Sequence, residues 1–184
     1  MPTIFSHAIF SSALGAAYAT EPMPKRFWLL AALCSVLPDF DVIAFGLGIP
    51  YRSVWGHRGI THSLLFAVLV GCAIAWTAFR AQELATMKRS RVSLAIFFSL
   101  ATTSHLMMDS LTSGGLGVAL FAPFENSRYF APWRPIRVSP IGADFFSARG
   151  LLALASEFIW VWLPAMALVA IAKLFHRIRT NKII

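Results

Sequence analysis

Long apolar stretches separated by short polar segments dominate the chain. Residues 63–79 carry no charge, and residues 151–175 carry one acid, Glu157, and one residue able to kink a helix, Pro164. Residues 92–108 form a third apolar stretch. Each approaches the roughly 20 residues that an α-helix needs to cross about 30 Å of hydrocarbon. The pattern therefore predicts three membrane-spanning helices in these regions.

The N-terminal third continues this pattern less regularly. Residues 4–20 are apolar and rich in alanine and serine, whereas residues 27–37 cover only half a span before Pro38, which is expected to stop the helix. With these segments included, we expect about four or five membrane helices, some of them short or re-entrant. We therefore predict an all-α, polytopic membrane helical bundle, formed as one domain over residues 1–184, with a long outer capping loop over residues 112–150.

The composition supports a membrane protein. Of the 184 residues, 58% are hydrophobic and 13% are charged, whereas a soluble domain has about 45–50% apolar and about 25% charged residues. The net charge is +8, which in a soluble protein would suggest a nucleic-acid partner. Because lysine and arginine gather at the cytoplasmic ends of membrane helices, the bilayer is the expected partner and no nucleic acid is expected.

Three groups of basic residues predict the orientation of the spans. They lie at residues 25–26, 80–91 and 173–182 and contain ten of the sixteen lysines and arginines. Placing all three groups in the cytoplasm gives five crossings that alternate correctly. In this orientation the other six arginines lie on the outer side. The inverted topology is therefore kept as the alternative.

Under this orientation, histidines and aspartates from separate segments reach the same face of the membrane. They lie about 20–27 Å from the basic ends, by the rise of a helix. Ionisable residues in membrane segments are costly and usually functional, so we expect one site that faces the non-cytoplasmic side. Its candidate metal ligands are His7, Asp39, Asp41, His57, His62, His105 and Asp109.

The spacing of these residues suits a metal ion. His105 and Asp109 are four residues apart and share one face of a helix. Residues 38–41 (PDFD) place two carboxylates at a helix break, and residues 57–63 (HRGITHS) place two imidazoles around a flexible glycine. Imidazole and carboxylate ligands are typical of Zn²⁺, Mn²⁺ or Fe²⁺. We predict a divalent metal, with zinc preferred, and a water that the metal activates as a nucleophile.

Two acids are candidates for a catalytic role. Asp41 is the carboxylate that we expect to orient or deprotonate the water. Glu157 lies about two turns inside the last span, where it could serve as a general base, a further ligand or a support for the ligands. A pairing of Glu157 with Arg149 or with a hydroxyl group is the alternative.

The outer loop is expected to cap the site. It is too long for a simple connection, and its many aromatic residues and prolines argue against disorder. Its arginines are bidentate donors that suit the phosphate or carboxylate of an anionic substrate. The alternative is that arginine and aromatic side chains anchor the loop at the lipid headgroups. The expected substrate-binding residues are Arg58, Arg128, Arg134 and Arg137.

Several motifs together resemble a known family. They are His7, LPDFD at residues 37–41, HRGITHS at residues 57–63 and SHLMMDSLT at residues 104–112, and the outer loop adds GGLGVALFAPF. Over nearly the whole chain, this set resembles the LexA-regulated, inner-membrane, metal-dependent hydrolases of the YdjM type. The resemblance implies a multi-pass hydrolase of the bacterial inner (cytoplasmic) membrane.

A fainter similarity concerns zinc-dependent phospholipase C and the P1-type nucleases, which are helical phosphodiesterases. It implies a bridging role for Asp109 between a first zinc ion and a second ion near His7. Those enzymes complete their site with a later histidine cluster that this chain lacks, so one or two ions are expected. The residues assigned to the first zinc are Asp39, His57 or His62, His105 and Asp109.

These inferences combine into a membrane-bound, metal-dependent hydrolase that cleaves a phosphoester of a lipid or lipid-linked substrate. A metal-ion or proton transporter is one alternative, and a non-catalytic membrane protein with a structural metal site is another. A transporter should continue its polar residues across the bilayer. The inner halves of the expected spans are almost purely apolar, which favours a site open to one side.

Overall fold

The computed structural model describes residues 1–140 and 142–181 and is all-helical, without a β-strand in these ranges. The described residues exclude Lys182, which belongs to the third basic group. One 3₁₀-helix (Leu37–Val42) joins α2 to α3, a second (Ile60–His62) precedes α4, and a third (Gly142–Phe146) precedes α7. The helices are α1 (Ile4–Tyr18), α2 (Lys25–Val36), α3 (Ile43–Gly46), α4 (Leu64–Thr77), α5 (Ala81–Thr86), α6 (Arg91–Ser110), α7 (Ala148–Glu157) and α8 (Leu163–Asn181).

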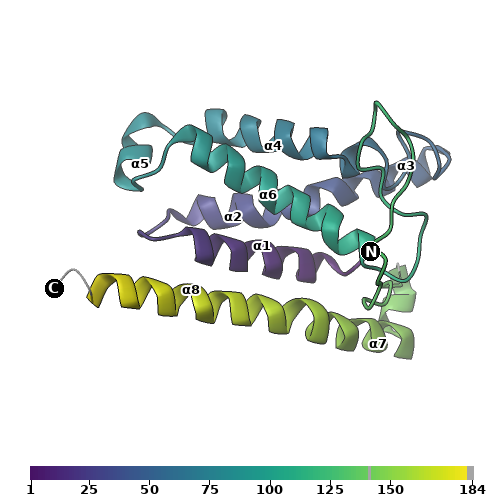
Figure 1. Ribbon diagram of the computed structural model, residues 1–184. Helices are drawn as coiled ribbons and strands as arrows, with labels where there is room; N and C mark the ends of the chain where they lie inside the picture. Colours follow the sequence, from purple (N-terminus) through teal and green to yellow (C-terminus); the bar gives the residue numbers. More distant parts are fainter. Residues whose placement is uncertain (141, 182–184) are drawn as a thin grey trace.

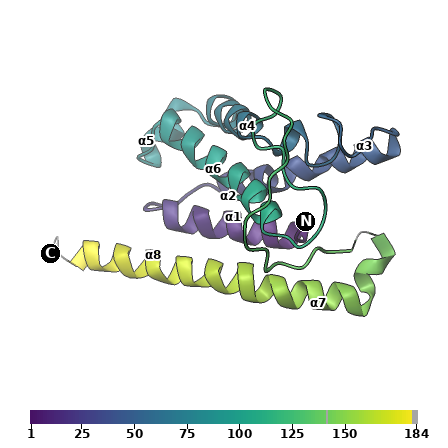
Figure 2. The ribbon, with the colours of Figure 1, turned by 45° about the vertical axis from the view of Figure 1, so that its right-hand side comes forward.

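Helix α6 is the centre of the bundle. It packs against α4, α2 and α1, and α8 covers α1 on one side, as Figure 1 and Figure 2 both show. The loop that follows α6 crosses the end of the bundle opposite α5 (Figure 1). This loop runs without a long helix to residue 140, and α7 already begins at Ala148, inside the predicted outer loop.

The two ends of the bundle have different interiors. Near α5, the core is made of aromatic and aliphatic side chains, among them Phe27, Phe79 and Phe98, which are all buried. Toward the end of α6, the buried side chains are polar, and they include His105 and Asp109. The polar side chains therefore gather in one half of the bundle.

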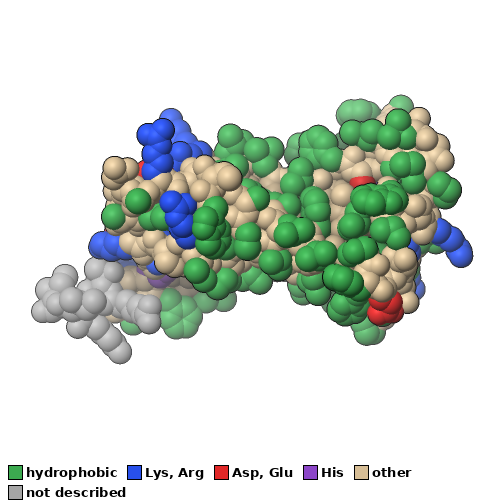
Figure 3. Space-filling view, turned by 90° about the horizontal axis from the view of Figure 1, so that it is seen from above, with side chains coloured by type: hydrophobic (Ala, Val, Ile, Leu, Met, Phe, Trp, Pro, Cys, Tyr) green, Lys and Arg blue, Asp and Glu red, His purple; other side chains and the backbone are tan. Residues whose placement is uncertain are grey.

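Within the described residues, three helical segments are long and apolar enough to cross a membrane: Lys25–Gly46, Arg91–Ser110 and Ala148–Ile178. The apolar helices Ile4–Tyr18 and Leu64–Thr77 are shorter. Seen from above, hydrophobic side chains cover much of the surface, and lysines and arginines gather at the end that holds α5 (Figure 3). The predicted helical membrane bundle is confirmed.

Two prolines behave differently in the helices. As expected, the α-helix α2 ends just before Pro38, at Val36, but the chain then continues through the 3₁₀-helix to α3. Pro38 lies in the first turn of that 3₁₀-helix, where a missing N–H is tolerated. Before Pro164, a π-helical turn over Phe158–Trp162 joins α7 to α8. A π-turn of this kind accommodates the missing backbone hydrogen bond of the proline.

Gly71 allows α4 and α6 to approach closely, and this contact gives a first prediction. A Cβ atom at Gly71 would lie 2.2 Å from Ser99 Oγ and 2.6 Å from the Ala95 carbonyl oxygen. Overpacking of this kind costs about 1–3 kcal/mol, so Gly71→Ala should lower the thermal unfolding midpoint by several degrees in detergent. Gly46→Ala is the matched control, because nothing lies within 4 Å of its Cβ position. Equal midpoints for the two variants would contradict the packing.

Candidate metal centre

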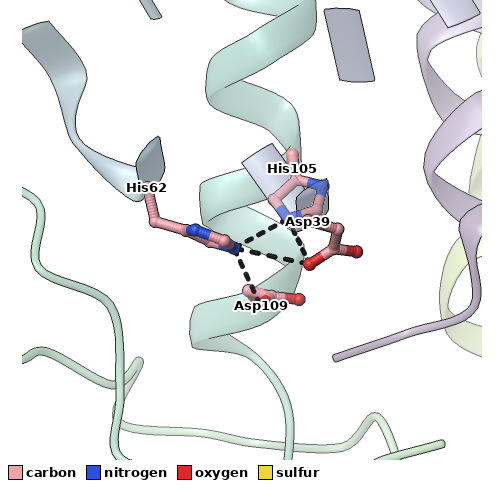
Figure 4. A group of neighbouring side chains, drawn as sticks. All are labelled: Asp39, His62, His105 and Asp109. Atoms are coloured by element: carbon pink, nitrogen blue, oxygen red, sulfur yellow. Dashed lines mark hydrogen bonds and ion pairs between the residues drawn. The ribbon is translucent and has the colours of Figure 1, made fainter. Parts of the chain in front are cut away.

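Four buried side chains from three elements converge beside the last two turns of α6 (Figure 4). His105 and Asp109 lie one turn apart on α6, Asp39 lies in the 3₁₀-helix after α2, and His62 ends the short 3₁₀-helix before α4. None is more than 5% exposed. One donor atom from each lies within 4.8 Å of the others.

The separations between these donor atoms match a tetrahedral metal site. His62 Nε2 lies 3.0 Å from His105 Nε2 and 3.6 Å from an oxygen of both Asp39 and Asp109. His105 Nε2 lies 3.4 Å from Asp39 Oδ1. A tetrahedral zinc ion with ligands at about 2.0–2.1 Å separates its ligand atoms by about 3.3 Å. The four residues therefore fit a divalent ion of this size.

Hydrogen bonds outside the pocket fix both imidazole tautomers. His105 Nδ1 lies 2.7 Å from the Ser35 carbonyl oxygen, which only accepts, so the proton sits on Nδ1. His62 Nδ1 lies 3.1 Å from Asp41 Oδ2 and is protonated for the same reason. In neutral imidazoles, the two Nε2 atoms then face each other at 3.0 Å with lone pairs. The two lone pairs repel each other unless a proton or a metal ion lies between the two nitrogens. Hydrogen bonds from Nδ1, as seen here for both rings, are the usual outer support of metal-binding histidines.

The buried charges around the pocket do not balance. The carboxylates of Asp39, Asp41 and Asp109 are opposed by the guanidinium of Arg58, whose Nε lies 2.8 Å from Asp109 Oδ2. With neutral imidazoles, the three carboxylates and one guanidinium leave two negative side-chain charges in a nearly dry interior, where unpaired charges are very costly. Neither oxygen of Asp39 or Asp109 accepts a hydrogen bond of good geometry. A divalent cation would neutralise the pocket.

The pKa of His62 is shifted by the same carboxylates. This residue lies in the connection between α3 and α4, outside the long apolar helices. Burial by itself lowers the pKa of His62, but the nearby carboxylates of Asp109, Asp39 and Asp41 outweigh burial and raise the pKa to about 10. The carboxylates therefore favour positive charge at this imidazole.

Asp41 lies behind His62, on the far side of the ring from the four donor atoms. Its Oδ2 accepts hydrogen bonds from the Thr61 hydroxyl (2.6 Å) and the Arg58 backbone N–H (3.0 Å), and its Oδ1 lies 2.6 Å from His57 Nδ1. Asp41, His57 and His62 Nδ1 form a second group close enough to share an ion. In the hydrogen-bonded arrangement, Asp41 instead braces both histidines.

His7 lies against the pocket from α1. Its ring stacks on the ring of His105, with centroids 3.8 Å apart, and its Nε2 lies 3.7 Å from Asp109 Oδ1. Neither ring nitrogen has a hydrogen-bond partner, although the side chain is fully buried. His7 therefore presents an unused donor atom on the other oxygen of Asp109.

Arg58 is held in the pocket by the start of the outer loop. Its two terminal nitrogens donate to the Gly114 carbonyl (3.0 Å) and the Thr112 hydroxyl (3.2 Å). Its backbone has a φ of 60°, a conformation that costs about 1–3 kcal/mol and often occurs at functional sites. The loop and the pocket therefore share this buried guanidinium.

The loop arginines lie farther from the four donors. Arg128 donates to backbone carbonyls alone, at 2.8–3.2 Å, and so holds the segment that carries His57 and Arg58. Arg134 stacks on Phe130, with its guanidinium carbon 4.7 Å from the ring centroid. The backbone N–H of Arg137 donates a hydrogen bond to the Ser156 hydroxyl at 3.0 Å. The structure brings only Arg58 of the four predicted arginines into contact with a pocket side chain.

Glu157 joins α7 to the beginning of α1. Its carboxylate accepts hydrogen bonds from the backbone N–H and hydroxyl of Thr3 (2.8 and 2.5 Å) and from the Ser6 hydroxyl (2.5 Å). The indole N–H of Trp162, in the π-turn, donates to the same Ser6 oxygen at 2.8 Å. These bonds fix the first turn of α1, one residue before His7.

Comparison with known proteins now identifies the family. The family model described as "YdjM inner membrane protein" matches residues 1–179. The chain belongs to this family. It is also 34% identical over 170 residues to "Inner membrane protein YbcI" of Escherichia coli (strain K12), which covers 92% of this chain and 95% of that protein. No solved structure matches the chain.

The family that the motifs predicted is thereby confirmed. Control by LexA and the fainter similarity to phospholipase C and P1-type nucleases stay predictions. Sequence reasoning missed the Ser35 carbonyl and Thr61, which orient the pocket of this YdjM-family protein from behind. A backbone carbonyl carries no sequence signal, but the serine and threonine beside the charged motifs offered a weak one.

Glu157 gives the second prediction. In Glu157→Gln, the uncharged side chain loses charge-assisted hydrogen bonds, which are worth about 1.5–3 kcal/mol each. We expect a clearly lower thermal unfolding midpoint and faster hydrogen exchange in the first turn of α1. Glu125→Gln is the control, because this exposed acid accepts a hydrogen bond from the nearby Tyr129 hydroxyl and does not join α7 to α1. If both variants have the thermal unfolding midpoint of the wild-type protein, Glu157 does not anchor α1.

Proposed function

We propose that this YdjM-family protein is a membrane-embedded, metal-dependent hydrolase. Asp39, His62, His105 and Asp109 would hold the ion, and two imidazoles with two carboxylates suit zinc best, with Mn²⁺ or Fe²⁺ as the next candidates. The observation that carries the proposal is the convergence of these four donors in one buried pocket, where two of them are carboxylates. A divalent ion of this kind supplies a water molecule whose pKa is near 7.

The surrounding side chains have separate roles in this proposal. Asp41 keeps the His62 proton on Nδ1 and so leaves Nε2 free for the ion. Arg58 holds one oxygen of Asp109 and places a positive charge where an anionic group would approach. His7 offers its unpartnered Nε2 to a second ion shared with Asp109, or to a proton released in the reaction. Glu157 acts through α1, because its carboxylate is fully engaged by Thr3 and Ser6.

The location of the pocket favours a lipidic, anionic substrate. It lies among helices that can span a membrane, near the end opposite the basic side chains around α5. By the preference of lysine and arginine for the cytoplasm, this end faces the non-cytoplasmic side of the inner membrane. A phosphoester of a lipid or lipid-linked molecule fits both the location and the buried arginine.

The number of ligands supports a second candidate, a structural metal site. Four protein ligands close a tetrahedral shell, whereas catalytic zinc usually keeps three and an open position. Asp109 can leave such a position only if its bond to Arg58 or to His7 competes with the ion. In the structural case, the ion would join the ends of α2, α4 and α6 without any chemistry.

The third prediction concerns metal content. We expect detergent-purified protein to contain about one divalent ion per chain and Asp109→Asn to lose at least about 90% of it, because removal of a ligand and its charge weakens binding by tenfold or more. Asp144→Asn is the control, since this exposed acid lies in the 3₁₀-helix Gly142–Phe146 and is not one of the four donors. Elemental analysis gives the result directly. An unchanged metal content in Asp109→Asn would contradict the site.

The fourth prediction separates an enzyme from a structural site. A panel of phospholipids is incubated with the metal-loaded protein, with the chelated protein and with Asp109→Asn, and the products are identified by mass spectrometry. If the protein is a hydrolase, we expect a lipid product from the metal-loaded wild-type protein, and none from the chelated protein or from Asp109→Asn. A fall in the unfolding midpoint on chelation, with no product from any lipid, would support the structural site. Uptake of zinc into proteoliposomes would instead favour a transporter.

A further inference from the structure

A hairpin of the outer loop, residues 116–129, packs over the segment that leads into α4. Val118 and Tyr129 exchange two backbone hydrogen bonds of 2.9 Å, which define the hairpin. The Ala119 N–H donates to the Arg58 carbonyl, and the Leu64 N–H donates to the Leu120 carbonyl. The hairpin is therefore tied both to the metal pocket's Arg58 and to the first residue of α4.

The hairpin lines a polar pocket of about 360 Å³ together with the loop before His57. The lining residues are Arg52, Leu116, Asn126 and Arg128. None of these four is acidic, and Arg52 has no ion pair within residues 1–140 and 142–181. The carbonyl groups that bind Arg128 leave its charge uncompensated. Two guanidinium groups thus face one cavity, an arrangement that suits a phosphate group.

Mutual repulsion of the cations agrees with this geometry. Burial lowers the pKa of Arg128 most strongly, and the neighbouring charges of Arg58 and Arg52 lower it further, against the opposing effects of Tyr51 and Asp41. An anion in the pocket would relieve this repulsion. Its affinity would come from Arg52, whose donors are free, and from the Asn126 amide.

The same hairpin lines an apolar groove of about 390 Å³. Leu64 and Leu65 form one part of the groove, at the point where α4 begins its apolar run. Phe124 is 86% exposed at the tip of the hairpin, which is unfavourable for an aromatic side chain in water. The acid at the groove, Glu125, is bound by the Tyr129 hydroxyl at 2.7 Å. The remaining lining residues are Leu120, Phe121 and Ala122.

A basic pocket and an apolar groove on one hairpin fit an amphiphile with a negatively charged head. We propose that this hairpin binds an anionic phospholipid, with its phosphate on Arg52 and Asn126 beside the charge of Arg128, and an acyl chain against Leu64, Leu120 and Phe124. The start of α4 supplies the route from the bilayer, because its leucines belong both to the groove and to the apolar helix. That this lipid is also the substrate rests on the proposed function, whereas its binding does not require the metal.

The experiment compares lipid retention by purified protein in mixed micelles of phosphatidylglycerol and phosphatidylcholine, measured by native mass spectrometry. We expect the wild-type protein to retain phosphatidylglycerol preferentially and Arg52→Gln to reduce that preference about three- to fivefold, as for a partly exposed charge pair. Arg52→Lys should restore part of the preference. Arg134→Gln is the matched control, because its guanidinium stacks on Phe130 rather than lining the pocket.

Two further variants make the assignment specific. Phe124→Ser should weaken the retention of both lipids, because it removes apolar area from the groove. Asp109→Asn should retain lipid as the wild-type protein does, so a failed hydrolase proposal leaves this result intact. Equal lipid preference in Arg52→Gln and the wild-type protein would overturn the inference. Inorganic phosphate that binds in an Arg52-dependent manner, with lipid retention unaffected by Phe124→Ser, would assign the pocket to a soluble anion and overturn it as well.

Discussion

The uncompensated negative charge in the polar half of the bundle is the constraint on which the rest of the structure depends. Asp39, Asp41 and Asp109 are buried together, and Arg58 is the arginine that pairs with one of them. Charged groups persist in such surroundings only when they are paired or bind a metal ion. With the imidazoles of His62 and His105 on the same centre, a divalent cation satisfies both the charge and the lone pairs.

The architecture around the pocket keeps these groups in place. The aromatic core near α5 packs α2, α4 and α6 together, so the ends of these helices meet at a fixed distance. Supporting hydrogen bonds then come from outside the pocket: Ser35 orients His105, and Asp41 orients His62. Glu157 binds Ser6 and so fixes the first turn of α1, and the next residue on that helix, His7, stacks on the ring of His105. Rigid helices, together with hydrogen bonds to the other atoms of the ligand side chains, hold the geometry of a metal pocket.

Much of this could be predicted from the sequence because its signals are local. Apolar runs of sufficient length predict the spans, and the spacing of His105 and Asp109 places both on one face of α6. The different roles of Asp39 and Asp41 could not be predicted, because they depend on the 3₁₀-helix that contains both residues. With about three residues per turn, this helix directs side chains two positions apart to different sides. Asp39 consequently enters the pocket while Asp41 lies behind His62. The contact between Glu157 and Thr3 joins residues 154 positions apart, and no local pattern predicts such a contact.

The most direct test of a shared cation is X-ray absorption spectroscopy at the metal edge of the zinc-loaded protein. The account predicts a first shell of nitrogen and oxygen at about 2.0–2.1 Å with outer-shell scattering from two imidazoles, and one imidazole fewer in His105→Ala. A first shell without imidazole, or a spectrum that His105→Ala leaves unchanged, would contradict the claim that His62 and His105 bind the same ion.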